Sequence, residues 1–212
     1  MKKPQPVNDT RQQILATARG IIVGKGFSAV GLSEILAAAR VPKGSFYHWF
    51  RSKEQFGEAL LDSHFEDYLR QVDNCLAAPG RTAGQRLLAF FGQWHATQSG
   101  DDMQSRCLVV KLSAEVCDLS EPMRGALERG TAQVLARLAT CLADGIAAGE
   151  LACCPDPADV ALQLYQQWLG ATLLARVQRS GEPLDRALAH TTRWVREQTA
   201  HECELASALA AS

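Results

Sequence analysis

The chain lacks any run of about 18 or more apolar residues, the length that a membrane-spanning helix needs. Its first residues, Met1 to Pro6, also lack the apolar stretch and the small-residue cleavage site of a secretory signal. These two absences argue against a membrane protein and against export. We therefore expect a cytoplasmic protein that makes no membrane contact.

Paired cysteines and other signs of metal binding or catalysis are also missing. The seven cysteines form no Cys-x-x-Cys pair and no Cys/His zinc spacing, and their odd number disfavours a disulfide framework. No nucleotide-binding glycine loop or catalytic triad is visible. We expect free thiols in a reducing compartment, no metal or other cofactor, and no enzymatic activity. The cysteines are Cys75, Cys107, Cys117, Cys141, Cys153, Cys154 and Cys203.

Strand-like alternation of apolar and polar residues is nearly absent. Apolar residues recur instead at spacings of three and four, which predicts an all-α fold. Beyond about residue 75 the pattern predicts longer amphipathic helices, helped by start signals such as Asp156-Pro157 and by glycine stops. We place these helices at about 82–98, 104–117, 121–148, 157–179 and 184–201.

The charge is distributed unevenly although the net charge is only −1. Residues 1–55 carry nine basic and three acidic side chains, a net charge of +6, whereas the remainder carries 13 basic and 20 acidic side chains. A basic N-terminal segment followed by an acidic remainder is typical of a polyanion-binding domain joined to a domain that does not bind polyanions.

The basic segment contains the pattern of three short helices. The first is predicted to open at Thr10 and to stop at Gly26, and Ser33 is predicted to cap the second. The run from Val41 to Gly44 breaks the helix, so a third helix starts near Ser45. Two short helices joined by a tight turn predict a helix-turn-helix unit. A capping box of Ser52 and Gln55 then opens a longer helix.

Three runs in this segment, Gly31 to Ile35, Val41 to Phe50 and Ser52 to Glu54, resemble the DNA-binding segment of the TetR family. The resemblance covers about a quarter of the chain. It implies a homodimeric transcriptional repressor that binds an inverted repeat in double-stranded operator DNA, although activation instead of repression stays open. We expect a helix-turn-helix DNA-binding domain at 1–55, a helical sensor and dimerisation domain at 56–205, and a disordered tail at 206–212.

The third helix is short enough to present one face to DNA while Phe46 and Phe50, four residues apart, point inward. The resemblance implies that Tyr47 and His48 touch phosphates or base edges and that Lys53 reaches a phosphate. Alternatively, Tyr47 and Trp49 are core aromatics and the lysines are solvated charges. The predicted DNA-binding residues are Ser33, Lys43, Gly44, Ser45, Tyr47, His48 and Lys53.

A second resemblance lies further along the chain. The stretch from Arg106 to Ser120, with Trp168-Leu169-Gly170-Ala171, resembles the NemR branch of the family, whose members sense electrophiles and oxidants through cysteine. Cys107 sits near a predicted helix start, beside Arg106 and one turn before Lys111, and these features favour the reactive thiolate. We predict Cys107 as the sensor, with a buried inert cysteine as the alternative. The resemblance implies an amine near the reactive thiol at the position of Arg176, and the arginine found there disfavours a covalent lysine partner.

The other thiols are less distinctive. Cys75, Cys117 and Cys141 lie among apolar residues, which favours core packing, and Cys117 is kept as a possible secondary thiol. The adjacent Cys153 and Cys154 are a resolving thiol, a site for a soft metal or an arsenical, or residues without a role.

Two predicted helices carry apolar faces with small residues, which suggests either a four-helix interface between two protomers or a core within one protomer. Their residues are Trp168, Leu169, Ala171, Thr172, Ala175, Ala187, Leu188, Thr191 and Trp194. For function, three alternatives stay open. They are a repressor switched by an electrophile or oxidant at a thiol, a repressor induced by a non-covalently bound apolar molecule, and a thiol enzyme, which the missing catalytic motifs disfavour.

Overall fold

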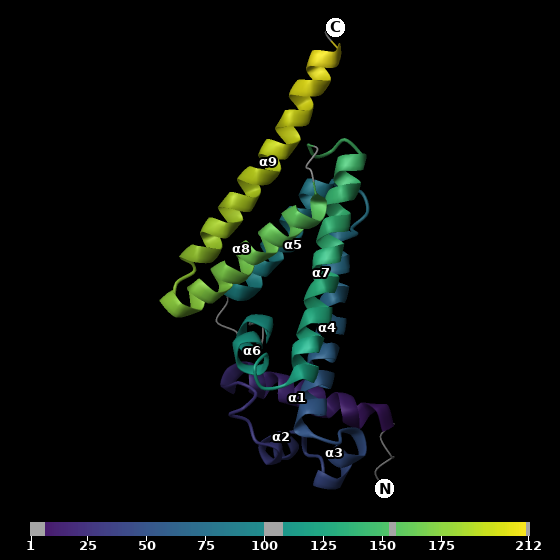
Figure 1. Cartoon of the computed structure of the whole chain (residues 1–212), viewed down its shortest axis with the longest axis vertical. Helices are drawn as coiled ribbons and strands as arrows, with labels where there is room; N and C mark the ends of the chain where they lie inside the picture. The colour runs from purple at the N-terminus through teal and green to yellow at the C-terminus, as the bar shows by residue number, and fades with distance from the viewer. Residues whose placement is uncertain (1–6, 100–107, 153–155, 211–212) are drawn as a thin grey trace. The chain divides into compact units, whose positions relative to one another are not determined.

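The computed structural model describes residues 7–99, 108–152 and 156–210, and over these residues it is helical without a strand (Figure 1). The all-α prediction is therefore confirmed. No helix in these ranges is long and apolar enough to cross a membrane. The helices are α1 (Val7–Lys25), α2 (Leu32–Ala39), α3 (Lys43–Trp49), α4 (Lys53–Leu76), α5 (Ala83–Ser99), α6 (Leu108–Val116), α7 (Glu121–Ala147), α8 (Pro157–Gln178) and α9 (Glu182–Ala210).

The chain divides into two compact units that alternate along the sequence. The first unit comprises the described residues of 1–67 and 101–130, and the second comprises those of 68–100 and 131–212. The division falls inside α4 and α7, so each of these helices contributes to both units. Helix α6 belongs to the same unit as the three short N-terminal helices.

The first unit has a core of aliphatic side chains from α1 and α2 and aromatic rings from α3 and α4. Phe46, Phe50 and Phe56 are almost completely buried, and their ring centroids lie 5.1 to 5.5 Å apart. Burial of one such ring stabilises the fold by about 2 to 3 kcal/mol. The inward direction predicted for Phe46 and Phe50 is confirmed. Buried aliphatic residues are Ile14, Leu15, Ala18, Ile22, Ile35, Leu36 and Ala39.

The predicted starts of α1 and α2 are wrong, whereas the predicted start of α4 is confirmed. Helix α1 already contains Thr10, and α2 begins at Leu32 with Gly31 as N-cap and no side-chain cap, so Ser33 lies inside the first turn. Gly31 takes the extended N-cap conformation itself, which leaves no capping role for the serine. The capping box before α4 forms, because Ser52 Oγ accepts from the Gln55 N–H (3.1 Å) and Gln55 Oε1 accepts from the Arg51 N–H (2.7 Å).

Helix α3 begins at Lys43, earlier than the predicted start near Ser45. Its N-cap is Pro42, with φ −62° and ψ 147°. Proline needs no hydrogen bond for its nitrogen, and its fixed φ suits the entry to a helix. The break between α2 and α3 is therefore confined to Arg40, Val41 and Pro42, and the turn is tight.

The second unit is built around aromatic rings held between α5, α8 and α9. The rings of Phe91 and Trp168 stack with centroids 5.1 Å apart. The Trp168 indole N–H donates to Thr191 Oγ1, and the Trp94 indole N–H donates to Thr172 Oγ1, each over 3.0 Å. These buried polar groups are all paired, which avoids the cost of unsatisfied donors.

This core corrects the interface residues expected from the sequence. Trp168, Ala171, Thr172, Ala187 and Thr191 are buried inside the protomer. A stripe of small residues looks the same whether it meets a helix of its own chain or of a partner, and here the intramolecular alternative holds for these positions. The apolar side chains of α8 that stay exposed are Leu162, Leu173, Leu174 and Val177.

The ends of the last two helices follow local signals. Asp156 caps α8 by accepting from the Ala158 N–H at 2.8 Å, with Pro157 in the first turn, as the sequence predicts. Helix α9 runs through Ala210, so residues 206–210 of the expected disordered tail are helical.

Candidate nucleic-acid interface

Helix α3 exposes the side chains that the sequence assigns to DNA. Tyr47 is 54% exposed, His48 is exposed, and the Tyr47 ring edge rests on buried Phe46 at a centroid distance of 5.4 Å. Trp49 is half-buried and packs against the His48 ring. The alternative that Tyr47 is a core aromatic is therefore wrong. The helix presents a polar face that is held in place by the phenylalanines beneath it.

Gly44 in the first turn of α3 is not required by the fold. A Cβ atom there would meet nothing within 4 Å, and its φ is not positive. Alanine would favour the helix by about 0.5 to 1 kcal/mol, so the glycine lowers stability without an internal reason. The open space above it suits the close approach of another molecule's backbone.

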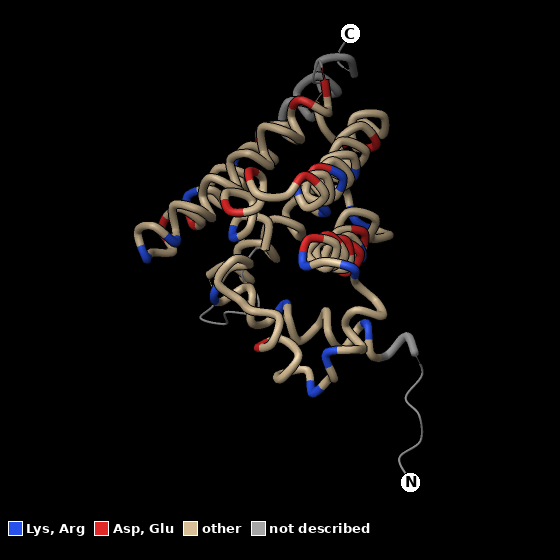
Figure 2. The backbone as a smooth tube through the Cα atoms, turned by 60° about the horizontal axis from the view of Figure 1, so that its bottom comes forward, with Lys and Arg blue, Asp and Glu red and all other residues tan. Residues whose placement is uncertain are grey.

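The other predicted residues lie on the same part of the unit. Ser33 and Lys43 are exposed, and Ser45 is half-buried. In Figure 2 most of the tube that carries α1 to α3 is tan, and the charged positions on it are mostly blue, the colour of lysine and arginine. Tyr47, His48 and Lys43 therefore share α3 with an excess of positive charge around them.

Lys53, at the start of α4, is less exposed than Lys43 and has a partner within the protein. It is half-buried, and its Nζ lies 4.9 Å from the centroid of the Phe27 ring, a cation–π contact. The alternative that it is simply a solvated charge is therefore wrong. The contact fixes the start of α4 against the loop that follows α1.

That loop is also held by Glu115 on α6. Glu115 accepts hydrogen bonds from the backbone N–H of Phe27 (3.0 Å) and of Ser28 (2.5 Å). Partial burial raises the pKa of Glu115, but the hydrogen bonds from Ser28 and Phe27 and the charge of Lys111 outweigh it, so the pKa lies below its usual value. Sequence alone does not single out Glu115, because nothing local links it to partners 87 and 88 positions away.

Gly26 makes room for this contact. It ends α1 as predicted, with φ +94°, and a Cβ atom there would lie 2.9 Å from Glu115 Oε2. Both the backbone conformation and the close approach of the carboxylate therefore favour glycine. Glu115 thus places α6 against the loop that leads into the helix-turn-helix.

Of the residues that the sequence assigns to sensing, Arg106, Cys107, Cys153 and Cys154 lie outside the described residues. Cys141 is buried, and burial raises the pKa of its thiol to about 11. Cys75 is half-buried, and burial likewise raises its thiol pKa. Cys117 is exposed just after α6, so the expectation of core packing is wrong for this residue.

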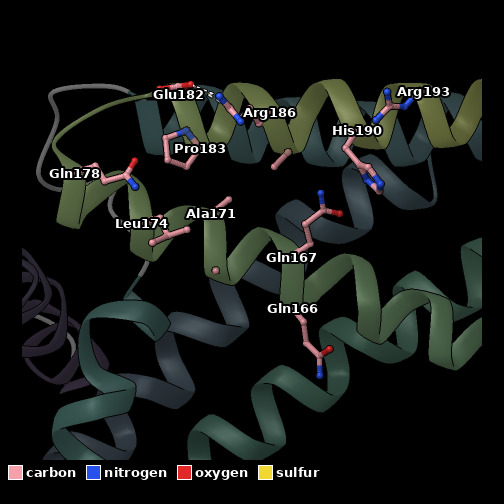
Figure 3. A pocket seen from close by; sticks show the side chains of 12 residues that line it. Gln166, Gln167, Ala171, Leu174, Gln178, Glu182, Pro183, Arg186, His190 and Arg193 are labelled. Carbon is pink, nitrogen blue, oxygen red and sulfur yellow. Dashed lines mark hydrogen bonds and ion pairs between the residues drawn. The ribbon is translucent and has the colours of Figure 1, made fainter.

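A groove of about 760 Å³ runs between α8 and α9 in the second unit (Figure 3). Helix α8 contributes Gln167, Ala171 and Leu174, and α9 faces them with Pro183, Arg186 and His190. Leu173 and Val177, both more than half exposed, extend the apolar surface of α8. Gly170 borders open space, so another backbone has room to approach there.

A smaller cavity of about 500 Å³ lies between α1 and α4 in the first unit. His64 lines it together with the ion pair of Arg19 and Asp67, whose atoms are 3.3 Å apart. Burial and the charge of Arg19 lower the pKa of His64 to about 3, so the ring stays neutral in the folded protein.

A short exposed helix on a buried aromatic base, surrounded by cations, defines a helix-turn-helix DNA-binding protein. The chain belongs to the TetR family. Residues 14–60 match the family described as "Bacterial regulatory proteins, tetR family", and residues 83–191 match "Tetracyclin repressor-like, C-terminal domain". The two resemblances seen in the sequence, one in the helix-turn-helix segment and one from Arg106 to Ser120, are both to this family.

Known relatives agree with this assignment. The chain is 46% identical to the HTH-type transcriptional repressor NemR of Escherichia coli (strain K12) over 189 residues, which cover 86% of this chain and 92% of that protein. The crystal structure of the reduced form of E. coli NemR matches with a TM-score of 0.83 and 44% identity over 87% of this chain and 96% of that one. The transcriptional regulator AcuR of Cereibacter sphaeroides is 33% identical, covering 82% of this chain and 79% of AcuR.

The chain is thus a DNA-binding transcriptional repressor and not an enzyme. Repressors of this family bind operator DNA as dimers.

Proposed function

We propose that this repressor releases its operator when an electrophile or oxidant modifies Cys107. Arg106 beside it and Lys111 one turn later favour the thiolate, which is the form that reacts. With an activated alkene such as N-ethylmaleimide, the thiolate sulfur forms a C–S bond as the C=C π bond breaks, and the other carbon takes a proton from water. Hypochlorous acid instead oxidises the thiolate to a sulfenic acid and is itself reduced to chloride, and a dithiol can reverse that oxidation. The 46% identity to NemR over most of the chain supports the proposal.

The observation that carries the proposal is the contact of α6 with the helix-turn-helix. Helix α6 begins at Leu108, directly after Cys107, and its Glu115 holds the backbone of Phe27 and Ser28. These residues connect α1 to α2. A displacement of α6 would therefore change the position of the DNA-reading helices without crossing into the second unit.

Cys75 and Cys141 are poorer sensors. The raised pKa values of Cys75 and Cys141 keep both thiols protonated at neutral pH, which slows their reaction. Exposed Cys117 is the rival within the described residues. A hundred-fold loss of operator affinity needs only about 2.7 kcal/mol of preference for the released conformation, so one modified thiol is sufficient.

The test is a gel-shift titration on duplex DNA that flanks the protein's own gene, with hypochlorite or N-ethylmaleimide. We expect Cys107→Ser to bind like the parent protein and to ignore both reagents, while Cys117→Ser and a Cys153→Ser/Cys154→Ser variant release DNA normally. Dithiothreitol should restore binding after oxidation but not after alkylation. A response that survives in Cys107→Ser and disappears in another variant would move the sensor to that thiol. A response retained without any cysteine would select a non-covalent inducer.

We also propose that the exposed face of α8 and the groove beside α9 hold a second copy of the chain. Leu173, Leu174 and Val177 form an apolar surface that is costly to leave in water, and Val177 is 71% exposed. Two helices from each protomer would then pack as a four-helix interface.

A further inference from the structure

The cations of the helix-turn-helix region fall into two groups. Between residues 10 and 67 there are seven lysines and arginines. Four have a partner within the unit: Lys25 binds Glu34, Arg19 binds Asp67, Arg11 lies over Phe50, and Lys53 lies over Phe27.

The other three, Arg40, Lys43 and Arg51, are exposed and have no side-chain partner among the described residues. Arg40 precedes α3, Lys43 is its first residue, and Arg51 follows its end. Among residues 10–67, the cations without a side-chain partner therefore lie at both ends of the DNA-reading helix.

Arg40 occupies a backbone conformation that glycine normally takes. It ends α2 with φ +54° and ψ 40°, and its N–H caps the helix by donating to Ala37 O at 3.1 Å. The left-handed region is unfavourable for a residue with a Cβ atom. Arginine therefore adds no stability to the fold at this position. An exposed guanidinium just before α3 is instead well placed to bind a ligand.

Arg51 has a fixed backbone and an unengaged guanidinium. Its N–H donates to Gln55 Oε1 at 2.7 Å, which anchors the residue between α3 and α4. A seven-residue helix is about 10 Å long, and the major groove is about 12 Å wide. Cations at the two ends of α3 therefore match the phosphate rows on either side of the groove.

We propose that Arg40 and Arg51 bind operator phosphates at the two ends of α3. Arginine suits this task because its planar fork donates two parallel hydrogen bonds to a phosphate. The inference rests on α3 as the DNA-reading helix. It does not depend on the thiol switch.

The test compares Arg40→Gly and Arg51→Gln with the parent in operator affinity at several salt concentrations, using duplex DNA that flanks the protein's own gene. Each variant removes two phosphate contacts per dimer, so operator affinity at 0.15 M salt should fall roughly ten- to thirty-fold. The salt slope, which is the slope of log affinity against log salt concentration, should become shallower by about two. Arg40→Gly should nevertheless melt higher by about 2 °C, because the backbone strain is relieved.

Arg179→Gly is the matched control, since Arg179 has the same left-handed backbone (φ +51°) at the end of α8 in the second unit. It should raise the melting temperature without changing affinity or salt slope. Unchanged salt slopes in both Arg40→Gly and Arg51→Gln would overturn the proposal, provided that Tyr47→Ala still abolishes binding. If Tyr47→Ala also binds normally, α3 is not the DNA-reading helix and the premise itself fails.

Discussion

At the scale of single residues, the buried side chain of His64 makes the stability of this repressor depend on pH. His64 has a pKa of about 3 in the folded protein, because burial and Arg19 disfavour its charged form, against 6.5 in a free side chain. The unfolded chain therefore takes up a proton near pH 6.5 that the folded chain refuses. Stability should fall as pH drops below 6.5 and continue to fall until about pH 3.

Replacing His64 by glutamine removes this dependence. Between pH 7 and pH 5 the parent should lose at most about 2 kcal/mol through this one group, and His64→Gln should lack that part of the loss. Urea unfolding of both proteins at the two pH values measures it. Equal losses in parent and variant would show that the ring takes up its proton in the folded state.

At the scale of elements, the contact of Glu115 with the loop after α1 is the link on which the switch depends. Glu115→Gln removes the charge while keeping the shape. We expect a loss of about 1 kcal/mol in unfolding free energy, allowing for solvent screening, and weaker operator binding even without an oxidant. Because the pKa of Glu115 is lowered, its contribution is complete above about pH 4.5 and is lost as pH falls through the folded pKa.

The matched control is Glu121→Gln, which breaks only an exposed pair with Arg124 in the same unit. It should leave operator affinity unchanged and stability nearly so. Urea unfolding between pH 8 and pH 3, with gel shifts at neutral pH, separates the two variants. If Glu115→Gln binds and releases DNA like Glu121→Gln, α6 does not act through this contact.

Elements that depend on neighbours in sequence were predictable, and contacts between distant segments were not. The four-residue spacing of Phe46 and Phe50 and the Ser52–Gln55 box are local, so both were found. Both Gly31 and Ser33 are suitable residues for the N-cap of α2, and sequence alone did not decide between them. Glu115 resembles any exposed helix carboxylate until its partner loop is seen, and the unengaged state of Arg40 and Arg51 appears only once their neighbours are placed.

At the scale of the whole molecule, the proposed dimer determines how α3 is presented to DNA. A two-fold dimer places two copies of α3 about 34 Å apart, which matches an inverted repeat with half-sites one turn apart. Leu174→Arg with Val177→Glu puts charges on the exposed face of α8 while leaving the buried Trp168 and Thr191 untouched. We expect monomers in sedimentation at micromolar protein, normal helicity, and operator affinity at least 100-fold weaker. A stable dimer in this variant would place the interface elsewhere.

Release of the operator through one modified thiol can be tested by counting modified thiols on protein that has released its DNA. Protein bound to duplex DNA flanking its own gene is titrated with N-ethylmaleimide, and bound and released fractions are separated and mapped by peptide mass spectrometry. We expect the alkylation of Cys107 to be nearly complete in the released fraction and nearly absent from the bound fraction, whatever the state of Cys117. Released protein with an unmodified Cys107, or bound protein with an alkylated one, would contradict it.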